Sequence, residues 1–547
     1  MSDDPKQEYF SDGITEDLIT DLSKISGLFV IARNSTFTYK GKPVNVQQVA
    51  RELGVRYVLE GSVRKAGEKV RLNAQLIDAT TGHHLWAERL DGQLGDIFAL
   101  QDRFTQKVVS ALAVKLTADD ESLLARKGTD NVEGYEAYLK GWEHQRRDTR
   151  DDLVKAVSNF KRAIELDPEY YNAHAALSAA YQHIVSKAWE VDLGWKDARS
   201  LALKHLQIAL KNPTPLALRM NSKALLYYKH RHEEAITEAE RALALDPNDS
   251  ENHWHLARVL TFAGRSAEAI GFYERAMRLN PHYPYWYPYY FGVAQYCLER
   301  YEEAATSQER ALILAPNMSP WWLSATYAQL GREEEAADAL AKYIKKRGWD
   351  VPYVESTFRY WPFKNQNDLD RFGEGLAKAG MLRPDNPAYR RKYSEAIAQA
   401  ERSIALNPND AKAHRMMAES LIFVGRSNEA LGFINKAISL EPDYSWYLYT
   451  LGLAQFCLEQ YEDALTSLEK FSNEHKAHSA GWLLAATYAH LGRQQKAENV
   501  LTKHMKSSGY KGHTVSRVLK FYLHAFKDPK DTARFAEGLH KAGLPMK

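Results

Sequence analysis

The sequence predicts an α/β N-terminal domain followed by an all-α solenoid, a superhelix of antiparallel helix pairs. Three observations support this fold class. A block of about 160 residues occurs twice in tandem, a shorter unit repeats within each block, and residues 10–118 instead show strand periodicity. A chain of 547 residues is also too long for one hydrophobic core.

The front of the chain predicts two helices separated by a strand. Asp12 and Gly13 precede the apolar-periodic segment ITEDLITDLSKI, so Asp12 is expected to cap a helix there. Leu28 to Arg33 form a short continuous apolar run, which is typical of a buried strand. The segment VNVQQVARELG is expected to be a second, amphipathic helix.

A three-stranded antiparallel meander is expected next. Residues 57–63, 70–76 and 84–90 alternate between apolar and polar, and turn residues separate them. A helix from about Ile97 to Leu116 closes a domain predicted to span residues 1–118. Residues 119–133 are then expected to be a linker to the repeats.

The repeats show a long-range duplication. LALDPND at 243–249 recurs as IALNPND at 404–410, and AGRSAEAIGF at 263–272 recurs as VGRSNEALGF at 424–433, both with an offset of 161 residues. RFGEGLAKAG at 371–380 returns as RFAEGLHKAG at 534–543. We therefore predict a first block over 134–382 and a second over 383–547, the second being a duplicate of about 221–382.

A unit of about 34 residues repeats within each block, and its apolar positions fit two packed helices. The unit that ends at Pro281 shows the pattern with Leu256, Ala257 and Leu260 on one helix and Ala269, Tyr273 and Ala276 on the next. This period and pattern are those of the tetratricopeptide repeat (TPR). About nine or ten units are expected, with an insertion within 183–200, a half-repeat at the start of the second block and a bend at about 365–392.

Several strings resemble a known domain. YFSDGITEDLITDL, ARNSTFTYKG, VARELGVRYVLEGSVRKAG and VRLNAQLIDATTGHHLWAERLDG are similar to the TolB amino-terminal-like (FlgO-like) domain of bacterial signalling proteins. In that family the domain stands between an output module and C-terminal TPRs. The resemblance implies that the output module is a class III adenylate/guanylate cyclase domain or, less often, a winged helix–turn–helix DNA-binding domain.

This chain departs from that family at its start, because the strand that usually precedes YFSDG is missing. Three explanations are open. The chain is a fragment of a longer product, or a neighbouring chain supplies the strand, or the sheet edge stays open and can pair with another copy. A homo-oligomer formed through that edge is one expected consequence.

Catalytic and metal-binding signatures are lacking. The sequence has no GxxxxGK[ST], GxGxxG after a strand, HExxH, CxxC or GxSxG motif, so we expect no catalytic residue, no metal and no cofactor. The formal charge of +2 gives no field that would attract nucleic acid. Cys297 and Cys457 occupy equivalent positions in different repeats and are expected to be buried free thiols. No run reaches the roughly 18 apolar residues of a membrane helix.

Two groups of residues are candidates for binding. The aromatic segment YPYWYPYYF suggests peptide contacts by Trp286, Tyr287, Tyr289 and Tyr290, with Trp321 and Trp322 as further candidates. The alternative is that these rings fill the repeat core, as the similar string DYSWYLYTL suggests. In the front domain, Asp12, Gly13 and Arg33 are candidates for a ligand site, although capping and turn roles explain them equally well.

The sequence thus favours a noncatalytic protein–protein interaction scaffold, the sensory or regulatory region of a bacterial signalling protein. Its partner is expected to be a protein or peptide on the concave TPR face. One alternative is the regulatory part of an adenylate/guanylate cyclase whose catalytic domain is absent or lies on a partner, and a weaker one is part of a transcriptional regulator. A cytoplasmic location is expected, or a periplasmic one if the parent protein is membrane-anchored.

Overall fold

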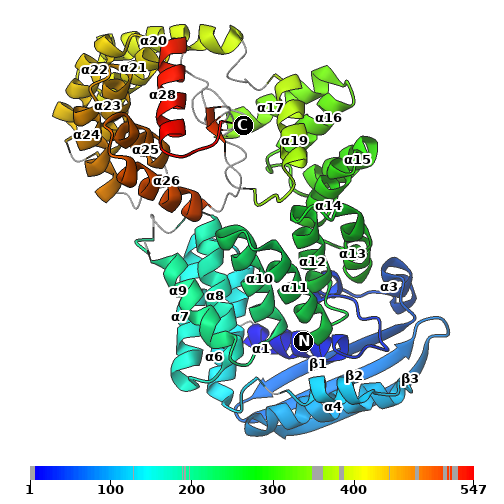
Figure 1. Ribbon diagram of the computed structural model, residues 1–547. Helices are drawn as coiled ribbons and strands as arrows, with labels where there is room; N and C mark the ends of the chain where they lie inside the picture. The colour runs from blue at the N-terminus through cyan, green and yellow to red at the C-terminus, as the bar shows by residue number, and fades with distance from the viewer. Residues whose placement is uncertain are drawn as a thin grey trace. The chain divides into compact units, whose positions relative to one another are not determined.

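The computed structural model describes residues 7–126, 128–187, 189, 193–195, 197–347, 361–380, 387–442, 444–474, 480–508, 514–515, 518–519 and 528–546. The chain divides into two compact units. Unit 1 comprises Met1–Tyr343 with Tyr360–Gly375, and unit 2 comprises Ile344–Arg359 with Leu376–Lys547. Unit 1 contains the α/β domain and most of the first repeat block (Figure 1).

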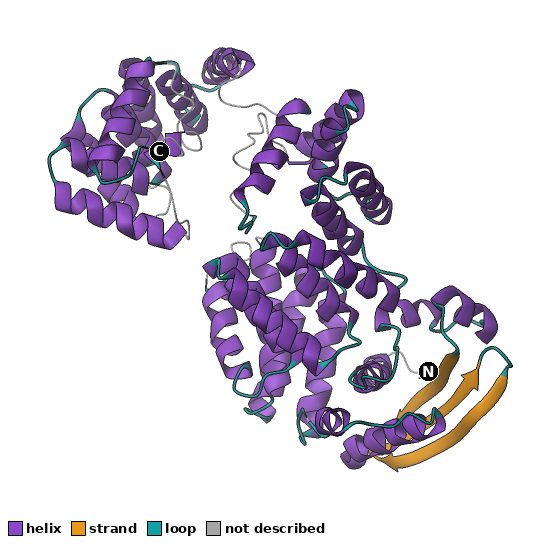
Figure 2. Ribbon diagram, turned by 45° about the vertical axis from the view of Figure 1, so that its right-hand side comes forward, coloured by secondary structure: helices purple, strands orange, loops and turns teal. Residues whose placement is uncertain are grey.

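The front domain is a three-stranded antiparallel sheet covered on one face by helices, as predicted (Figure 2). Strands β1 (Tyr57–Ala66), β2 (Lys69–Asp78) and β3 (His83–Gln93) follow one another in space as in sequence. Val63, Val70 and Leu72 of the sheet join one core with residues of α1 (Glu8–Ser23) and α4 (Ile97–Ala111). The opposite face carries polar cross-strand pairs such as Gln75 with Glu60, so the domain has two layers.

Three expectations for the front domain are corrected. Helix α1 begins at Glu8, so Asp12 lies inside it and does not cap it. Leu28 to Ala32 form no strand, because the backbone N–H of Ala32 donates to the carbonyl of Leu279 in the solenoid, at 2.8 Å. Residues 119–133 are only partly a linker, since Thr117 begins helix α5 (Ala118–Leu124) with a capping box.

The remaining elements of the front domain are short. Helix α2 (Arg33–Thr36) runs into a 3₁₀ turn, η2 (Phe37–Tyr39), and a second 3₁₀ turn, η3 (Leu94–Asp96), precedes α4. Helix α3 (Val46–Leu53) forms where it was predicted. The Asn45 side chain caps its start, and Gly54 ends it with a φ of 63°, a left-handed conformation that favours glycine.

The front domain docks on the solenoid through specific contacts within unit 1. Asn248, in the loop before α12, donates from its side chain to the carbonyls of Ser23 and Ile25 at 3.3 and 3.0 Å. Arg278 near the end of α13 donates to the carbonyls of Leu53 and Gly54 at 2.9 and 2.7 Å. The aromatic ring of Phe29 lies beneath the guanidinium groups of Arg275 and Arg278. The apolar run expected as a strand is therefore a docking segment.

The solenoid is a series of antiparallel helix pairs, which confirms the predicted fold class. In unit 1 the pairs are α6 (Val132–Arg146) with α7 (Arg150–Leu166), α8 (Tyr171–Ser186) with α9 (Ala198–Ala209), α10 (Pro215–Lys229) with α11 (His232–Leu245), α12 (Ser250–Phe262) with α13 (Ser266–Leu279), α14 (Trp286–Cys297) with α15 (Tyr301–Leu314), and α16 (Trp321–Gln329) with α17 (Glu333–Arg347). Helix α19 (Gln366–Lys378) follows. The expected insertion lies between α8 and α9, partly outside the described residues.

Unit 2 repeats this arrangement. One helix, α20 (Pro387–Leu406), packs on α21 (Ala411–Phe423), which pairs with α22 (Ser427–Leu440). The pairs α23 (Trp446–Cys457) with α24 (Tyr461–Glu474) and α25 (Gly481–His490) with α26 (Gln494–Ser508) follow, and α28 (Pro529–Lys541) packs on α25. The second block thus starts with a single helix. The expected bend at 365–392 falls partly outside the described residues.

Both copies of the duplicated block have the same contact near their C-terminal ends, which we call the closing contact: an arginine of the last helix donates to the carbonyl of a cysteine. Arg371 of α19 donates to the carbonyl of Cys297 at 3.3 Å, and Arg534 of α28 donates to the carbonyl of Cys457 at 2.9 Å. Each arginine also pairs with the aspartate three residues before it. Both cysteines are free thiols, and burial raises the pKa of each. The matching sequence strings therefore correspond to matching structure.

Candidate functional site

The first helices of the repeats in unit 1 carry the aromatic candidates, and their side chains divide into two classes. Tyr287 and Trp322 are fully buried. The Tyr287 hydroxyl donates to Glu251 of α12 at 2.8 Å, and the Trp322 ring stacks on Phe372 of α19 at 3.8 Å between centroids. These two rings hold neighbouring helices together. They therefore fit the alternative that the aromatic residues fill the repeat core.

Trp321 is also largely covered, with 9% of its surface exposed. The ring of Trp361, in the segment that precedes α19, lies 5.7 Å from the Trp321 ring and 5.6 Å from that of Trp322. The backbone carbonyl of Phe262 accepts from Lys364 in the same segment at 2.8 Å. Residues 361–364 therefore cover the pair of tryptophans.

Trp286 remains at the surface, with 36% of its side chain exposed beside Tyr285 at 39%. Tyr289 and Tyr290, on the same helix, are half-buried. In unit 2 the equivalent of Trp286, Trp446, is again exposed, at 38%, and Tyr444 two residues before it is 46% exposed, whereas Ser445 stands at the position of Tyr285. A tryptophan that reaches the surface at equivalent positions of both copies does not serve core packing alone.

Three residues that the sequence patterns did not single out lie behind these rings. We call them the cation cluster: Lys223 lies on α10, and His255 and Arg258 lie on α12. The Arg258 guanidinium lies 4.6 Å from the centroid of Trp254, 5.6 Å from that of Tyr227 and 5.7 Å from that of Tyr290. The first helices α10, α12 and α14 contact one another in series (Figure 1).

Among the described residues the cation cluster forms no ion pair with a carboxylate, although the Arg258 charge acts on the carboxyl of the buried Glu251. Arg258 is 8% exposed and donates from Nη2 to Nδ1 of His255 at 3.1 Å. Within the described part of the chain, no Asp or Glu oxygen lies within 4.0 Å of the Lys223 or Arg258 nitrogens. Burial and the Arg258 charge lower the pKa of Lys223 to about 8, and burial with three neighbouring cations lowers the pKa of His255 well below 6.5.

A neighbouring arginine shows the usual arrangement. Arg219, one turn before Lys223 on α10, donates to Asp249 at 2.7 Å and to Asn252. Buried charges are normally paired in this way because an isolated one is costly. The cation cluster is the exception beside it.

The front-domain candidates are brought together only in part. Asp12 lies 3.7 Å from Arg33 and 2.5 Å from Lys40, and Arg33 also pairs with Glu16 at 3.2 Å while its guanidinium covers the Phe37 ring. Gly13 faces the other way, against Leu139 of α6. Asp12 and Arg33 thus neutralise each other and neighbouring charges.

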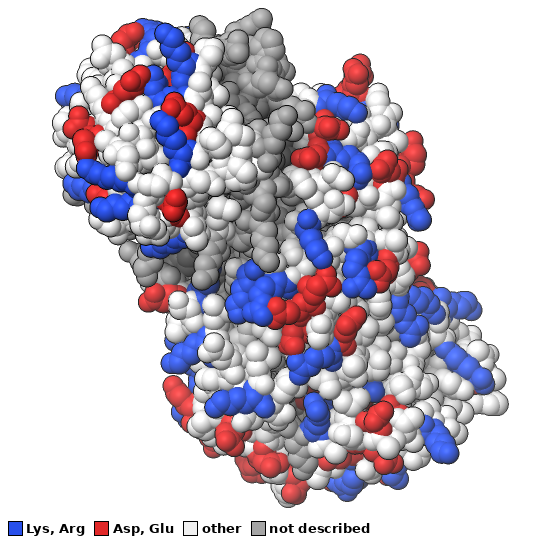
Figure 3. Space-filling model, in the orientation of Figure 1, with Lys and Arg blue, Asp and Glu red and all other residues white. Residues whose placement is uncertain are grey.

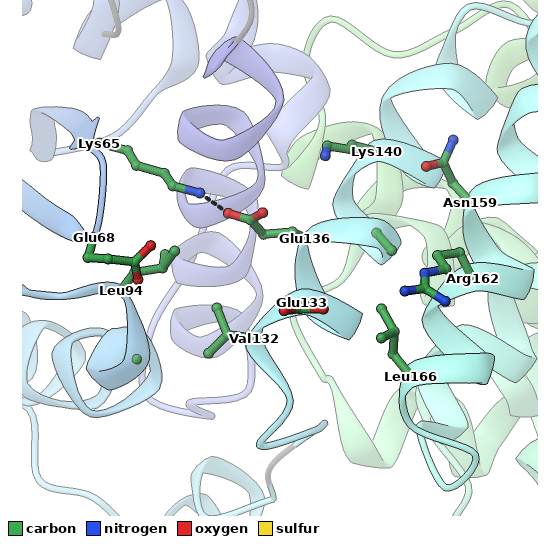
Figure 4. Close-up of a pocket in the computed structure, with 12 residues that line it drawn as sticks. Lys65, Glu68, Leu94, Val132, Glu133, Glu136, Lys140, Asn159, Arg162 and Leu166 are labelled. Carbon is green, nitrogen blue, oxygen red and sulfur yellow. Dashed lines mark hydrogen bonds and ion pairs between the residues drawn. The ribbon is translucent and has the colours of Figure 1, made fainter.

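A surface cavity of about 620 Å³ lies between the front domain and the first helix pair (Figure 4). Its lining mixes both charge signs: the front domain contributes Lys65 and Glu68, and the first helix pair contributes Glu133, Glu136, Lys140 and Arg162. Lys65 and Glu136 form an ion pair across it. Charges of both signs are likewise interspersed over the visible surface (Figure 3). The cavity therefore has no preference for one charge, unlike the cation cluster.

The described residues contain no group of three metal-ligating side chains. None of their helices combines the length and the apolar character needed to cross a bilayer.

Comparisons with known families match three parts of the chain. Residues 4–107 match the family described as "HilA/YgeH-like transcriptional regulator, second domain". Residues 226–288 match a tetratricopeptide repeat family, and residues 390–471 match "Anaphase-promoting complex, cyclosome, subunit 3". The TPR character of the solenoid is thereby supported on both blocks.

Curated relatives match over limited stretches. A Rhizobium meliloti (strain 1021) protein named "Putative adenylate cyclase 3" is 54% identical over 178 residues, which are 32% of this chain and 30% of that protein. "Tetratricopeptide repeat protein 37" of Xenopus laevis is 25% identical over 362 residues, which are 61% of this chain and 20% of that protein. The chain thus spans less than a third of the length of either relative.

Solved structures match the chain at low sequence identity and low TM-score. One described as "Functional Characterization of Pseudomonas Aeruginosa pilF" has a TM-score of 0.31 at 21% identity and covers 40% of this chain and 94% of its own. Another, "Crystal structure of YrrB: a TPR protein with an unusual peptide-binding site", has a TM-score of 0.23 at 16% identity, with 44% and 95% covered.

Proposed function

We propose that this chain is a noncatalytic interaction scaffold whose first helices in unit 1 bind a protein or peptide. The exposed aromatic pair Tyr285 and Trp286 supports this most directly. Stacked helix pairs hold these rings on a rigid frame, and rigid aromatic side chains contribute most of the binding energy in many interfaces. Tyr289 and Tyr290 extend the same surface behind them.

The scaffold belongs, in this proposal, to a bacterial signalling protein. The resemblance of the front domain to the TolB amino-terminal-like domain supports a sensory or regulatory role. The contacts of Asn248 and Arg278 with the front domain also support it, because they join the two parts of unit 1 mechanically.

A second candidate function is the regulatory part of an adenylate or guanylate cyclase. The 54% identity with the Rhizobium meliloti protein over 178 residues favours it. The two candidates differ in one measurement. Cyclic nucleotide formed from ATP or GTP by the purified chain would contradict the noncatalytic proposal, whereas stimulation of a separately purified cyclase by the inactive chain would support the cyclase-linked one.

A role in transcription is supported only by the front-domain match to a HilA/YgeH-like regulator. Specific retention of a DNA fragment by the chain would support this role. We rank it third, since the balanced charge of the chain supplies no electrostatic footprint for DNA.

The scaffold proposal is tested with a pair of matched variants. Trp286→Ala removes an exposed ring of α14, and Leu85→Ala removes a side chain on β3 that is 45% exposed. Proteins retained by the immobilised wild-type chain are identified, purified and titrated against each variant. We expect Trp286→Ala to weaken binding about tenfold or more and Leu85→Ala to leave it unchanged. Equal binding by all three chains would contradict the proposal.

A further inference from the structure

The loop between α11 and α12 carries a carboxyl group that is buried without an ion-pair partner. Asp246, directly after α11, is 3% exposed, and its Oδ1 has no hydrogen-bond partner. Within the part of the chain that the structure describes, no Lys, Arg or His nitrogen lies within 4.0 Å of its carboxyl oxygens. Burying an ionised carboxylate without such a partner is costly, and a carboxyl group avoids the cost by taking up a proton.

The front domain is what covers Asp246. The same loop occurs in unit 2, where LNPND stands in place of LDPND at the 161-residue offset. There the equivalent residues Asn407 and Asn409 are exposed, whereas Asp246 and Asn248 of unit 1 are buried. The loop of unit 1 lies against Ser23 at the end of α1, whose carbonyl accepts from the Asn248 backbone N–H at 3.3 Å. Burial of the carboxyl group therefore depends on docking of the front domain.

The charged groups that face Asp246 do not neutralise it. Lys24, which follows α1, forms an ion pair with Asp21 at 2.7 Å. Arg219 of α10 likewise forms one with Asp249 at 2.7 Å, and Asp249 brings a second negative charge close to the buried carboxyl. Burial and that charge raise the pKa of Asp246, against the smaller effects of a serine hydroxyl of α1 and the two cations.

The neighbouring repeat shows that docking by itself does not require a carboxyl group here. Asn280 occupies the equivalent position one repeat later, where LNP replaces LDP. Its side-chain oxygen accepts from the Ser35 hydroxyl of the front domain at 2.6 Å. An uncharged amide thus makes the same kind of contact with the front domain. An aspartate at 246 adds a group that can ionise.

We propose that the contact between Ser23–Ile25 and the α11–α12 loop is a proton-operated switch, in which the front domain docks with Asp246 protonated and ionisation of this carboxyl releases the front domain. Undocking exposes the carboxyl to water, where an aspartate titrates near pH 4. The docked chain therefore holds a proton that the undocked chain gives up. Between about pH 4 and the higher pKa of the docked chain, each rise of one pH unit should weaken docking about tenfold.

The test follows docking in the full chain by hydrogen–deuterium exchange. The reporter is the N–H of Ala32, which donates to the carbonyl of Leu279 in the solenoid and is distant in sequence from Asp246. Its exchange is measured at about pH 5, 6 and 7 in the wild type and in Asp246→Asn. Dividing the two protection factors at each pH cancels the intrinsic pH dependence of exchange and the titration of Asp17. We expect this ratio to fall about tenfold for each pH unit.

A matched variant and a second readout locate the proton. Asn407→Asp places a carboxyl group at the exposed equivalent position in unit 2 and should leave the exchange of Ala32 unchanged. Infrared spectroscopy distinguishes a protonated carboxyl group from a carboxylate. At about pH 6 the wild type should show a protonated-carboxyl band that is weaker in Asp246→Asn and no stronger in Asn407→Asp. Thermal unfolding checks folding, and Asp246→Ser, which also lacks a titrating group, replaces Asp246→Asn if that variant does not fold.

Two results would overturn the inference. One is a ratio of protection factors that stays constant between about pH 5 and 7. The other is a protonated-carboxyl band of equal strength in the wild type and in the variant that lacks the Asp246 carboxyl.

Discussion

The Ser35 hydroxyl donates a buried hydrogen bond of 2.6 Å to the side-chain oxygen of Asn280, 245 positions later in the sequence. The same hydroxyl oxygen accepts from the backbone N–H of His282 at 2.8 Å. Ser35 is fully buried, and Asn280 is 2% exposed. The front domain is thus fixed to the end of α13 by a bond that water cannot replace.

Substitution Ser35→Ala should lower the free energy of unfolding of unit 1 by about 1–3 kcal/mol, because it removes the donor to the buried Asn280 side-chain oxygen and the acceptor of the His282 N–H. Urea denaturation followed by circular dichroism measures the change. Thr38→Ala, which removes an exposed hydroxyl of the same segment, serves as the control and should have little effect. Equal stability of the Ser35→Ala and wild-type chains would show that the front domain is not held by this contact.

Two glycines inside helices should respond to alanine in opposite directions. A Cβ atom on Gly13 would lie 2.5 Å from Leu139, whereas one on Gly271 would meet no atom within 4 Å. Gly13→Ala is expected to cost about 1–3 kcal/mol through overpacking between α1 and α6. Gly271→Ala should stabilise the chain by about 0.5–1 kcal/mol, since alanine is the better helix former. Thermal melting of both variants checks the pair, and a shift in the same direction for both would contradict the packing described.

The stability of unit 1 should depend on pH through Asp17. Burial raises the pKa of its carboxyl to about 7, although the Tyr135 hydroxyl and the Gln101 amide donate to it. An unfolded aspartate titrates near pH 4, so between about pH 4 and 7 the folded state binds the extra proton and stability falls as pH rises. Asp17→Asn keeps the acceptor without the charge and should flatten this dependence. Urea denaturation at pH 4.5 and pH 7.5 measures it, and equal slopes for both chains would contradict the assignment.

The closing contact of unit 2 should be sensitive to Arg534→Met. The change removes a donor to the Cys457 carbonyl and the cation beside Asp531, whose side chain is 8% exposed. A loss of about 1–3 kcal/mol is expected. Arg426→Met breaks a surface pair with Glu429 and should cost no more than about 1 kcal/mol. Chemical denaturation of both variants makes the comparison, and similar losses would mean that the contact is only a surface pair.

Periodicity predicted the meander and the helix pairs because those elements are determined by local patterns. It failed at Leu28 to Arg33, where an apolar run was expected to be a strand. The backbone partner of Ala32 is the carbonyl of Leu279, and no local pattern identifies a partner so distant in the sequence. The prediction that Asp12 caps a helix was also wrong, because helix α1 already begins at Glu8.

The aromatic candidates were found by composition, which does not distinguish Trp286 at the surface from Trp322 in the core. The cation cluster was missed because lysines and arginines on helices usually face solvent. A signal for it was present in the sequence. The two copies of the block match closely around α12 and α21, yet Trp254 and Arg258 are replaced by Arg415 and Glu419. Such a change of charge within a retained frame marks a position whose surroundings differ between the two copies.

Hydrogen–deuterium exchange of the full chain, with and without the partner protein retained by it, tests the central claim most directly. The account predicts slower exchange in the first helices of unit 1, above all residues 250–262 and 286–297, with no change in the second helices 232–245 and 266–279. Protection confined to the second helices, or none within unit 1, would contradict it.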